Sequence, residues 1–272
     1  MKLRAITGFF FIIVMLGSVL LGQYVFDVFY LVLGAFCLWE FYSNVKKSSI
    51  KPNLATGLLG GVMIYLVYAI INYHHDAFHT GLPVLLPVVL SFIFIQELFK
   101  KHDAPFTNIA YTYLGIFFTV VPFTFFHALG YINGGFTFHF PMAFLLMLWA
   151  NDTGAYLVGS KLGKHKLFER HSPKKTWEGF VGGMLITAGA ALWISHYFAD
   201  IPPVQWVIVG VLISCFGTLG DLVESMFKRS IDVKDSGGLL PGHGGLLDRF
   251  DGLLIAAPIV YTYLYVYFII IK

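Results

Sequence analysis

Long apolar runs alternate with short polar segments along the whole chain. A helix that crosses a bilayer needs about 20 mostly apolar residues. Nine runs approach this length, so the pattern predicts an all-α integral membrane protein that forms one polytopic membrane domain, residues 1–272. The predicted spans are approximately Ile6–Gly22, Val25–Tyr42, Leu54–Ile71, Leu82–Phe99, Ile109–His127, Pro141–Val158, Phe180–Phe198, Val204–Val223 and Leu253–Ile271.

Composition supports a bilayer as the solvent. The chain of 272 residues is 57% hydrophobic and only 12% charged, whereas soluble domains carry about 25% charged residues. A soluble protein of this size has too little interior to bury so much apolar surface. Cys37 and Cys215 lie singly inside apolar runs, so we expect two buried thiols and no disulfide.

The distribution of positive charge predicts the direction of insertion. With the N-terminus in the cytoplasm and nine spans, every Lys and Arg except Lys272 falls on the cytoplasmic side. Cytoplasmic loops of membrane proteins are enriched in Lys and Arg. We therefore expect a cytoplasmic N-terminus and a C-terminus outside.

Several carboxylates lie inside or at the ends of the apolar runs. Glu40 and Glu97 lie near the cytoplasmic ends of their runs, and their simplest interpretation is as interfacial charges near Lys46 and Lys100. Asp152 follows a long apolar stretch, where an ionisable residue usually has a function.

Two further carboxylate groups suggest a metal site. Asp221, Glu224 and Ser225 have the spacing of one helical face. Asp248 and Asp251 are three residues apart and share a face if the last helix begins there. Pairing these faces predicts a carboxylate cluster at the cytoplasmic surface, and all-oxygen ligands favour Mg²⁺. The alternative is a salt-bridge network at the helix ends that includes Asp248, Arg249, Lys228 and Arg229.

The loop from residue 159 to residue 176 is basic. Such a loop beside a membrane ordinarily contacts anionic head groups. Its end is more specific: Ser172-Pro173 predicts a turn, and Thr176 is placed to cap a helix that opens at Trp177. The adjacent Lys174 and Lys175, beside a helix N-terminus, suit a pyrophosphate or triphosphate.

The segment from Ser225 to Asp251 packs Lys, Arg, Asp, His and Gly together in an otherwise apolar chain. It resembles the signature of the phosphatidate cytidylyltransferases at every specified position. The matching residues are Ser225, Phe227, Lys228, Arg229, Lys234, Asp235, Gly237, Leu240, Pro241, His243, Gly244, Gly245, Leu246, Asp248, Arg249, Phe250 and Asp251. The segments that begin at Asn151 and Ser172 are similar to two other blocks of this family. Residues 141–272 carry the resemblance, and residues 1–140 resemble the family only in hydropathy.

The resemblance implies a Mg²⁺-dependent enzyme, with a second metal ion as an option, that uses CTP and phosphatidic acid to make CDP-diacylglycerol and pyrophosphate. It also implies a multi-pass protein of the bacterial inner (plasma) membrane, a possible homodimer, and no nucleic-acid partner. The implied metal ligands are Asp221 and Asp248, with Asp251 and Asp152 as second choices. The implied catalytic residues are Lys228, Arg229, Lys234, Asp235, His243 and Arg249. The implied substrate-binding residues are Asn151, Ser172, Lys174, Lys175, Thr176, Ser225, Gly244 and Gly245.

Two other functions remain open from the sequence. A CTP-dependent polyprenol or lipid kinase has the same substrate classes, but its product is CDP instead of pyrophosphate. An ion-coupled transporter could use Asp152, Asp221 and Glu224. Transporters usually show internal repeats and midplane sites, whereas this chain shows no repeat and its charges gather at one face.

Overall fold

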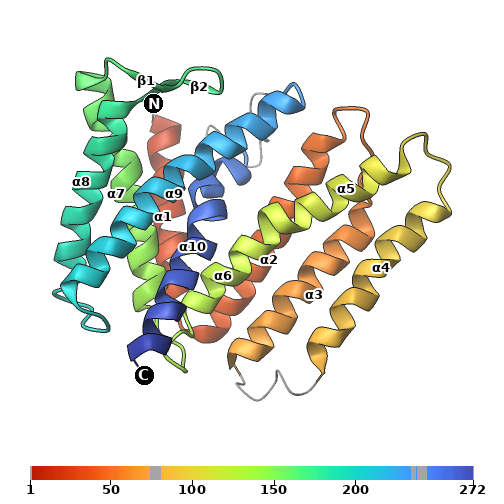
Figure 1. Ribbon diagram of the computed structural model, residues 1–272, viewed down its shortest axis with the longest axis horizontal. Helices are drawn as coiled ribbons and strands as arrows, with labels where there is room; N and C mark the ends of the chain where they lie inside the picture. Colours follow the sequence, from red (N-terminus) through yellow and green to blue (C-terminus); the bar gives the residue numbers. More distant parts are fainter. Residues whose placement is uncertain (1, 74–80, 234–236, 238–243, 272) are drawn as a thin grey trace. The chain divides into compact units, whose positions relative to one another are not determined.

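The computed structural model describes residues 2–73, 81–233, 237 and 244–271, and helices make up most of them (Figure 1). The helices in the first half are α1 (Lys2–Leu20), α2 (Gln23–Val45), α3 (Leu54–Tyr73), α4 (Leu85–Leu98), α5 (Pro105–Gly115) and α6 (Val121–Leu129). Those in the second half are α7 (His139–Leu162), α8 (Trp177–Ile194), α9 (Pro203–Ser230) and α10 (Leu247–Ile271). A short 3₁₀ turn, η2 (Leu82–Val84), precedes α4, and a π-helical stretch, η3 (Ile116–Val120), joins α5 to α6.

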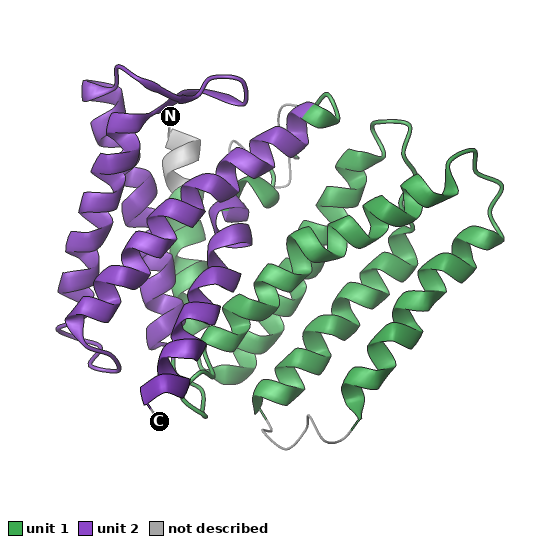
Figure 2. Cartoon of the chain, in the orientation of Figure 1, with its two compact units in different colours: residues 1–137, 230–249 green, residues 138–229, 250–272 purple. Residues whose placement is uncertain are grey.

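The chain forms two compact units (Figure 2). Unit 1 contains residues 1–137 and 230–249, and unit 2 contains residues 138–229 and 250–272. The first division falls at residue 137, but residues 230–249, which belong to the signature segment, group with the N-terminal helices.

Apolar helices long enough to cross a membrane confirm the prediction of a helical, multi-pass membrane protein. Among the described residues, six helical stretches qualify by length and hydropathy: α2, α3, the run Pro105–Leu129, α8, α9 and α10. Thr7–Leu20 and Leu82–Leu98 are shorter apolar helices. The count of nine spans and the direction of insertion stay predictions.

In unit 1, α3 lies beside α2, α4 and α6. The turn between α1 and α2 is very short because Gly22 takes a φ of 97°, a conformation that is strained for other residues. Aromatic side chains fill the interior, and Phe26, Tyr30, Phe123 and Phe126 are fully buried. These helices therefore pack through large apolar side chains.

In unit 2, α7 and α8 pack closely along their length. The backbones approach at small residues, since a Cβ atom on Gly183 would lie 2.9 Å from the backbone oxygen of Asn151. The glycine pair Gly182-Gly183 therefore serves helix packing, because a Cβ atom at either position would meet α7 at close range.

A two-stranded antiparallel sheet interrupts the helical pattern between α7 and α8. Its strands are β1 (Lys166–Phe168) and β2 (Ser172–Thr176). The prediction of a turn at Ser172-Pro173 was wrong, because these residues begin β2 and the turn occupies residues 169–171. Both strands of a two-stranded sheet are edge strands, where proline is tolerated.

Candidate active site

A close crossing of α9 and α10 in unit 2 brings two predicted metal ligands together. A Cβ atom on Gly220 would collide with the backbone oxygen of Asp251 and would lie 3.1 Å from Cα of Gly252. Only glycine permits this approach, and Asp221 follows directly in the chain. The carboxylates of Asp221 and Asp251 consequently act on one another electrostatically.

Two more acidic side chains belong to the same neighbourhood. Asp152 on α7 and Glu224 on α9 also act electrostatically on Asp251. Asp152 is exposed, whereas Asp221 and Asp251 are partly buried and Glu224 is fully buried. Clustered like charges repel one another, and the repulsion is stronger away from water. The site therefore needs cations, and unit 2 supplies lysines to it.

Lys175 from β2 provides one of these cations. Its Nζ lies 2.7 Å from Oδ2 of Asp221 and 3.4 Å from the backbone oxygen of Thr218. Ser225 donates to Oδ1 of Asp221 at 3.3 Å, one helical turn along α9. Asp221 is thus flanked by an ammonium group and a hydroxyl, both predicted to bind substrate.

A second lysine pairs within α9. Nζ of Lys228 lies 2.6 Å from Oε2 of Glu224, and both side chains are largely shielded from solvent, at 15% and 1% exposure. Arg229, the next residue, is exposed. On α9, the charge of Lys228 is therefore balanced by Glu224, whereas the side chain of Arg229 is exposed.

The end of the β1–β2 hairpin is fixed by the predicted helix cap. Thr176 has extended backbone angles and accepts a hydrogen bond from the amide of Gly179 at 3.2 Å. This is the N-cap geometry, and it confirms the predicted helix cap at Thr176, whereas substrate binding by this residue stays a prediction. Lys174 is exposed and Ser172 is partly buried in β2. The cap fixes the point at which β2 ends and α8 begins, directly after Lys174 and Lys175.

Asn151 lies in the interior instead of facing solvent. It is 2% exposed, and its Oδ1 accepts a hydrogen bond from Ser214 at 2.6 Å. This bond joins α7 to α9 beside the exposed Asp152. The contact accounts for an asparagine at this position, and substrate binding by Asn151 stays a prediction.

Residues 244–249 of the signature segment belong to unit 1, and here Asp248 holds a turn in place. Its Oδ2 accepts a hydrogen bond from the amide of Gly245 at 3.0 Å. Gly244 has a φ of 81°, and a Cβ atom there would lie 2.8 Å from the same oxygen. Gly244 and Gly245 therefore let the chain fold tightly against Asp248, while Arg249 is exposed.

Three predicted catalytic residues, Lys234, Asp235 and His243, lie outside the described residues. Their roles stay predictions.

The carboxylate oxygens of the acidic cluster are the kind of ligand that Mg²⁺ prefers, but they do not form a complete coordination site by themselves. Within residues 2–73, 81–233, 237 and 244–271, no three Asp, Glu, His or Cys side chains gather in a metal-holding arrangement. Mg²⁺ is commonly held by one or two carboxylates together with substrate phosphates. Asp221, already paired with the Lys175 ammonium, is a site where a cation is stabilised.

Glu40 is the residue that the sequence-based prediction misassigned most clearly. It is 4% exposed, and its Oε2 accepts a hydrogen bond from the amide of Leu247 at 2.7 Å. The interpretation as an interfacial charge near Lys46 was wrong. A glutamate among apolar residues of a span is costly, so its burial here calls for an explanation through its contacts.

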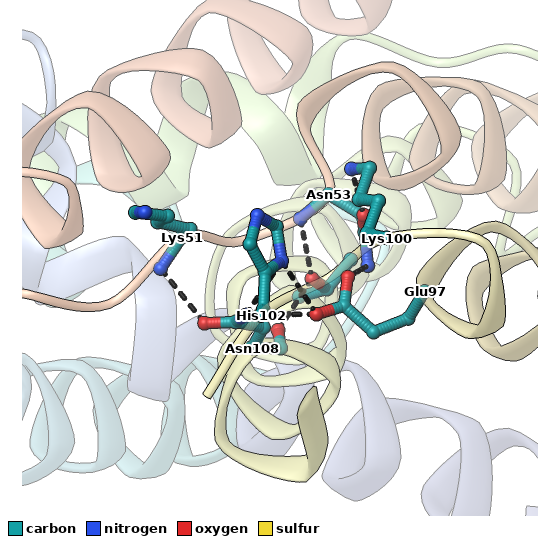
Figure 3. Close-up of polar contacts among 7 residues, drawn as sticks. Lys51, Asn53, Glu97, Lys100, His102 and Asn108 are labelled. Atoms are coloured by element: carbon teal, nitrogen blue, oxygen red, sulfur yellow. Dashed lines mark hydrogen bonds and ion pairs between the residues drawn. The ribbon is translucent and has the colours of Figure 1, made fainter. Parts of the chain in front are cut away.

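Glu97 is also buried, in a polar cluster of unit 1 (Figure 3). Its carboxylate accepts from the side-chain amides of Asn53 and Asn108 at 2.9 and 2.8 Å, and it contacts Nδ1 of His102 at 2.9 Å. Lys100 bonds Asn53 instead of Glu97. The interfacial interpretation was wrong here too, because the carboxylate ties α4 to α5 and to the start of α3.

The fold and this site define a class: a multi-pass helical membrane protein that gathers carboxylates and lysines in one place. The family model described as the cytidylyltransferase family matches residues 2–267. The chain is 35% identical over 263 residues to the phosphatidate cytidylyltransferase of Staphylococcus aureus strain COL, covering 96% of this chain and 97% of the relative. It is 36% identical over 264 residues to that of Staphylococcus saprophyticus, with the same coverage, and 34% identical over 269 residues to that of Bacillus subtilis, covering 96% of both chains. The chain belongs to the cytidylyltransferase family.

Proposed function

We propose that the protein transfers a cytidylyl group from CTP to phosphatidic acid and releases pyrophosphate. The observation that carries this proposal is the pairing of Lys175 with Asp221 inside an acidic cluster, in a chain that matches phosphatidate cytidylyltransferases over 96% of its length. One substrate is a lipid and the other a soluble nucleotide, which accounts for a charged site in an otherwise apolar protein.

The reaction needs positioning and charge neutralisation but no enzyme nucleophile. A phosphate oxygen of phosphatidic acid attacks the α-phosphorus of CTP, and a new P–O bond forms there. The bond from the α-phosphorus to the bridging oxygen breaks, and its electron pair leaves with pyrophosphate. Charge stabilisation and alignment supply most of the catalysis in such phosphoryl transfers.

The lysines and arginines of the site take the phosphate charges. Lys175 is placed to exchange Asp221 for a triphosphate oxygen, and the exposed Lys174 adjoins it in the chain. Lys228, Arg229 and Arg249 are proposed to hold the lipid phosphate or the departing pyrophosphate. Lys234, Asp235 and His243 are proposed to act with them on the basis of the signature match alone.

Mg²⁺ is proposed as the cofactor, with Asp221 and Asp251 on the crossing helices as ligands and Asp152 close by. Asp248, three residues before Asp251 on α10, is a further proposed ligand, and the number of carboxylates leaves room for a second ion. When bound, the ion would neutralise the triphosphate and the charge that develops on the leaving pyrophosphate.

The membrane arrangement is proposed from charge and hydropathy. Nine spans, with the N-terminus in the cytoplasm and the C-terminus outside, put the acidic cluster and the basic hairpin at the cytoplasmic face. This arrangement gives CTP access from the cytosol and places the protein in the inner (plasma) membrane. A homodimer is proposed from the family resemblance only.

The proposal is tested with purified protein in detergent, supplied with CTP, phosphatidic acid and Mg²⁺. Pyrophosphate and CDP-diacylglycerol are measured together, with Asp248→Asn alongside wild-type protein. Equal amounts of the two products, lost in the variant, are expected. CDP without pyrophosphate would assign the protein to the lipid kinases. A folded protein with no turnover on any lipid phosphate would reopen the transporter hypothesis.

A further inference from the structure

Glu40 is a carboxylate in the apolar interior of unit 1. Its neighbours on α2, Cys37, Leu38 and Phe41, are all fully buried, and Glu40 itself is 4% exposed. A buried carboxylate is costly unless hydrogen bonds compensate it. The contacts of Glu40 must therefore offset the free-energy cost of burying its carboxylate.

Both carboxylate oxygens of Glu40 contact the signature segment. Oε2 accepts from the amide of Leu247 at 2.7 Å, and Leu247 is the first residue of α10. Helix N-termini present free amides and positive partial charge, so an anionic acceptor is strong there. Oε1 lies against Gly237, where a Cβ atom would collide with it. Glu40 thus contacts the segment at two points ten residues apart.

The segment that Glu40 contacts carries proposed catalytic groups. Asp248 directly follows Leu247, and its Oδ2 holds the amide of Gly245. Glu40 also acts electrostatically on the same turn, since it lies close enough to Asp248 for mutual repulsion. The position of Asp248 therefore depends on where Glu40 fixes the start of α10.

We propose that Glu40 is a positioning residue of the N-terminal half that sets the geometry of the signature segment for catalysis. It acts through Leu247 and Gly237 and touches no reacting atom. The expected loss of kcat rests on the proposed function. The expected ordering of residues 244–247 by Glu40 does not depend on which reaction the protein catalyses.

The first readout is hydrogen–deuterium exchange of the signature segment in detergent-purified protein. Glu40→Ala removes the acceptor, and loss of one buried hydrogen bond should speed exchange at the Leu247 amide about tenfold. Glu40→Gln keeps an acceptor oxygen and should protect this amide much better. If Glu40→Ala fails to fold, Glu40→Asp, whose shorter side chain cannot keep both contacts, replaces it.

The second readout is kinetic, on the folded fraction of each variant. A displaced catalytic group commonly costs about a hundredfold in rate, so kcat should fall by about that factor in Glu40→Ala, with partial recovery in Glu40→Gln. Glu97→Ala is the matched control, because Glu97 is equally buried in the same unit but bonds Asn53 and Asn108 instead. It should lower thermal stability while leaving exchange at Leu247 and kcat near wild type.

The outcomes separate the two proposals. Exchange and kcat near wild type in folded Glu40→Ala, or effects equal to those of Glu97→Ala, would overturn the role of Glu40. An inactive wild-type protein whose Leu247 amide still depends on Glu40 would count against the proposed reaction and not against the ordering of the segment.

Discussion

Nζ of Lys175 lies 2.7 Å from Oδ2 of Asp221 and joins the β1–β2 hairpin to α9. The two residues are far apart in sequence and come from different element types, so the pair exists only in the fold. The side chains are 25% and 37% exposed, so neither is sealed in the interior. We take this pair as the centre of the proposed site, because it joins a proposed substrate-binding lysine to a proposed metal ligand.

Replacing Lys175 should reduce nucleotide binding. Lys175→Gln is expected to raise the KM for CTP about tenfold or more, because one charge-assisted contact to phosphate is lost. Lys161→Gln is the control, since Lys161 is an exposed lysine at the end of α7 outside the cluster. Steady-state kinetics on both variants checks this prediction. Equal KM values in the two variants would show that general positive charge, and not the pair, binds CTP.

Adding a methyl group at Gly220 should disturb the crossing of α9 and α10. In Gly220→Ala the new Cβ meets the backbone oxygen of Asp251, so the helices must separate and the Asp221 and Asp251 carboxylates with them. We expect folded protein with activity reduced by about tenfold to a hundredfold. Gly189→Ala on α8 is the control, because nothing lies within 4 Å of a Cβ there. Wild-type activity in Gly220→Ala would contradict the need for a close crossing.

The buried pair of Lys228 and Glu224 predicts a stability effect that is separable from catalysis. Lys228→Ala removes the ammonium group paired with the Glu224 carboxylate, which is 1% exposed, and breaking such a pair costs about 3–5 kcal/mol. The double change Lys228→Met with Glu224→Gln should recover much of the thermal stability but not the activity. Melting temperature and turnover are measured on the same samples. Full stability in Lys228→Ala would mean that the pair does not stabilise the fold.

The sequence predicts the helical elements well, because the physical signals for them are local. Apolar runs matched helices, and Thr176 caps α8 as its residue type and position indicated. The β1–β2 hairpin was missed because its strands are short and exposed, and Ser172-Pro173 is more typical of a turn. Six helices in the described part of the chain are long and apolar enough to span a membrane, and the number of spans and their direction stay predictions.

The candidate site was only partly predictable. The spacing of Asp221 and Glu224 placed both carboxylates on one stretch of α9, and the structure brings them near Asp251, because spacing on a helix is a local property. The partners were not predictable: Asp221 with Lys175, and Glu40 with Leu247, join residues distant in sequence. No periodicity encodes such contacts, and tertiary packing alone decides whether Glu40 and Glu97 face the interface or the interior.

The central claim, cytidylyl transfer at the acidic cluster, is tested most directly with CTP labelled at either the α- or the γ-phosphorus. Purified wild-type protein and Asp221→Asn are each incubated with phosphatidic acid and Mg²⁺, and the label in the lipid and in pyrophosphate is counted. We predict that the α-label enters the lipid and the γ-label enters pyrophosphate, and that both transfers are lost in folded Asp221→Asn. Entry of the γ-label into the lipid, or full transfer in Asp221→Asn, would contradict the account.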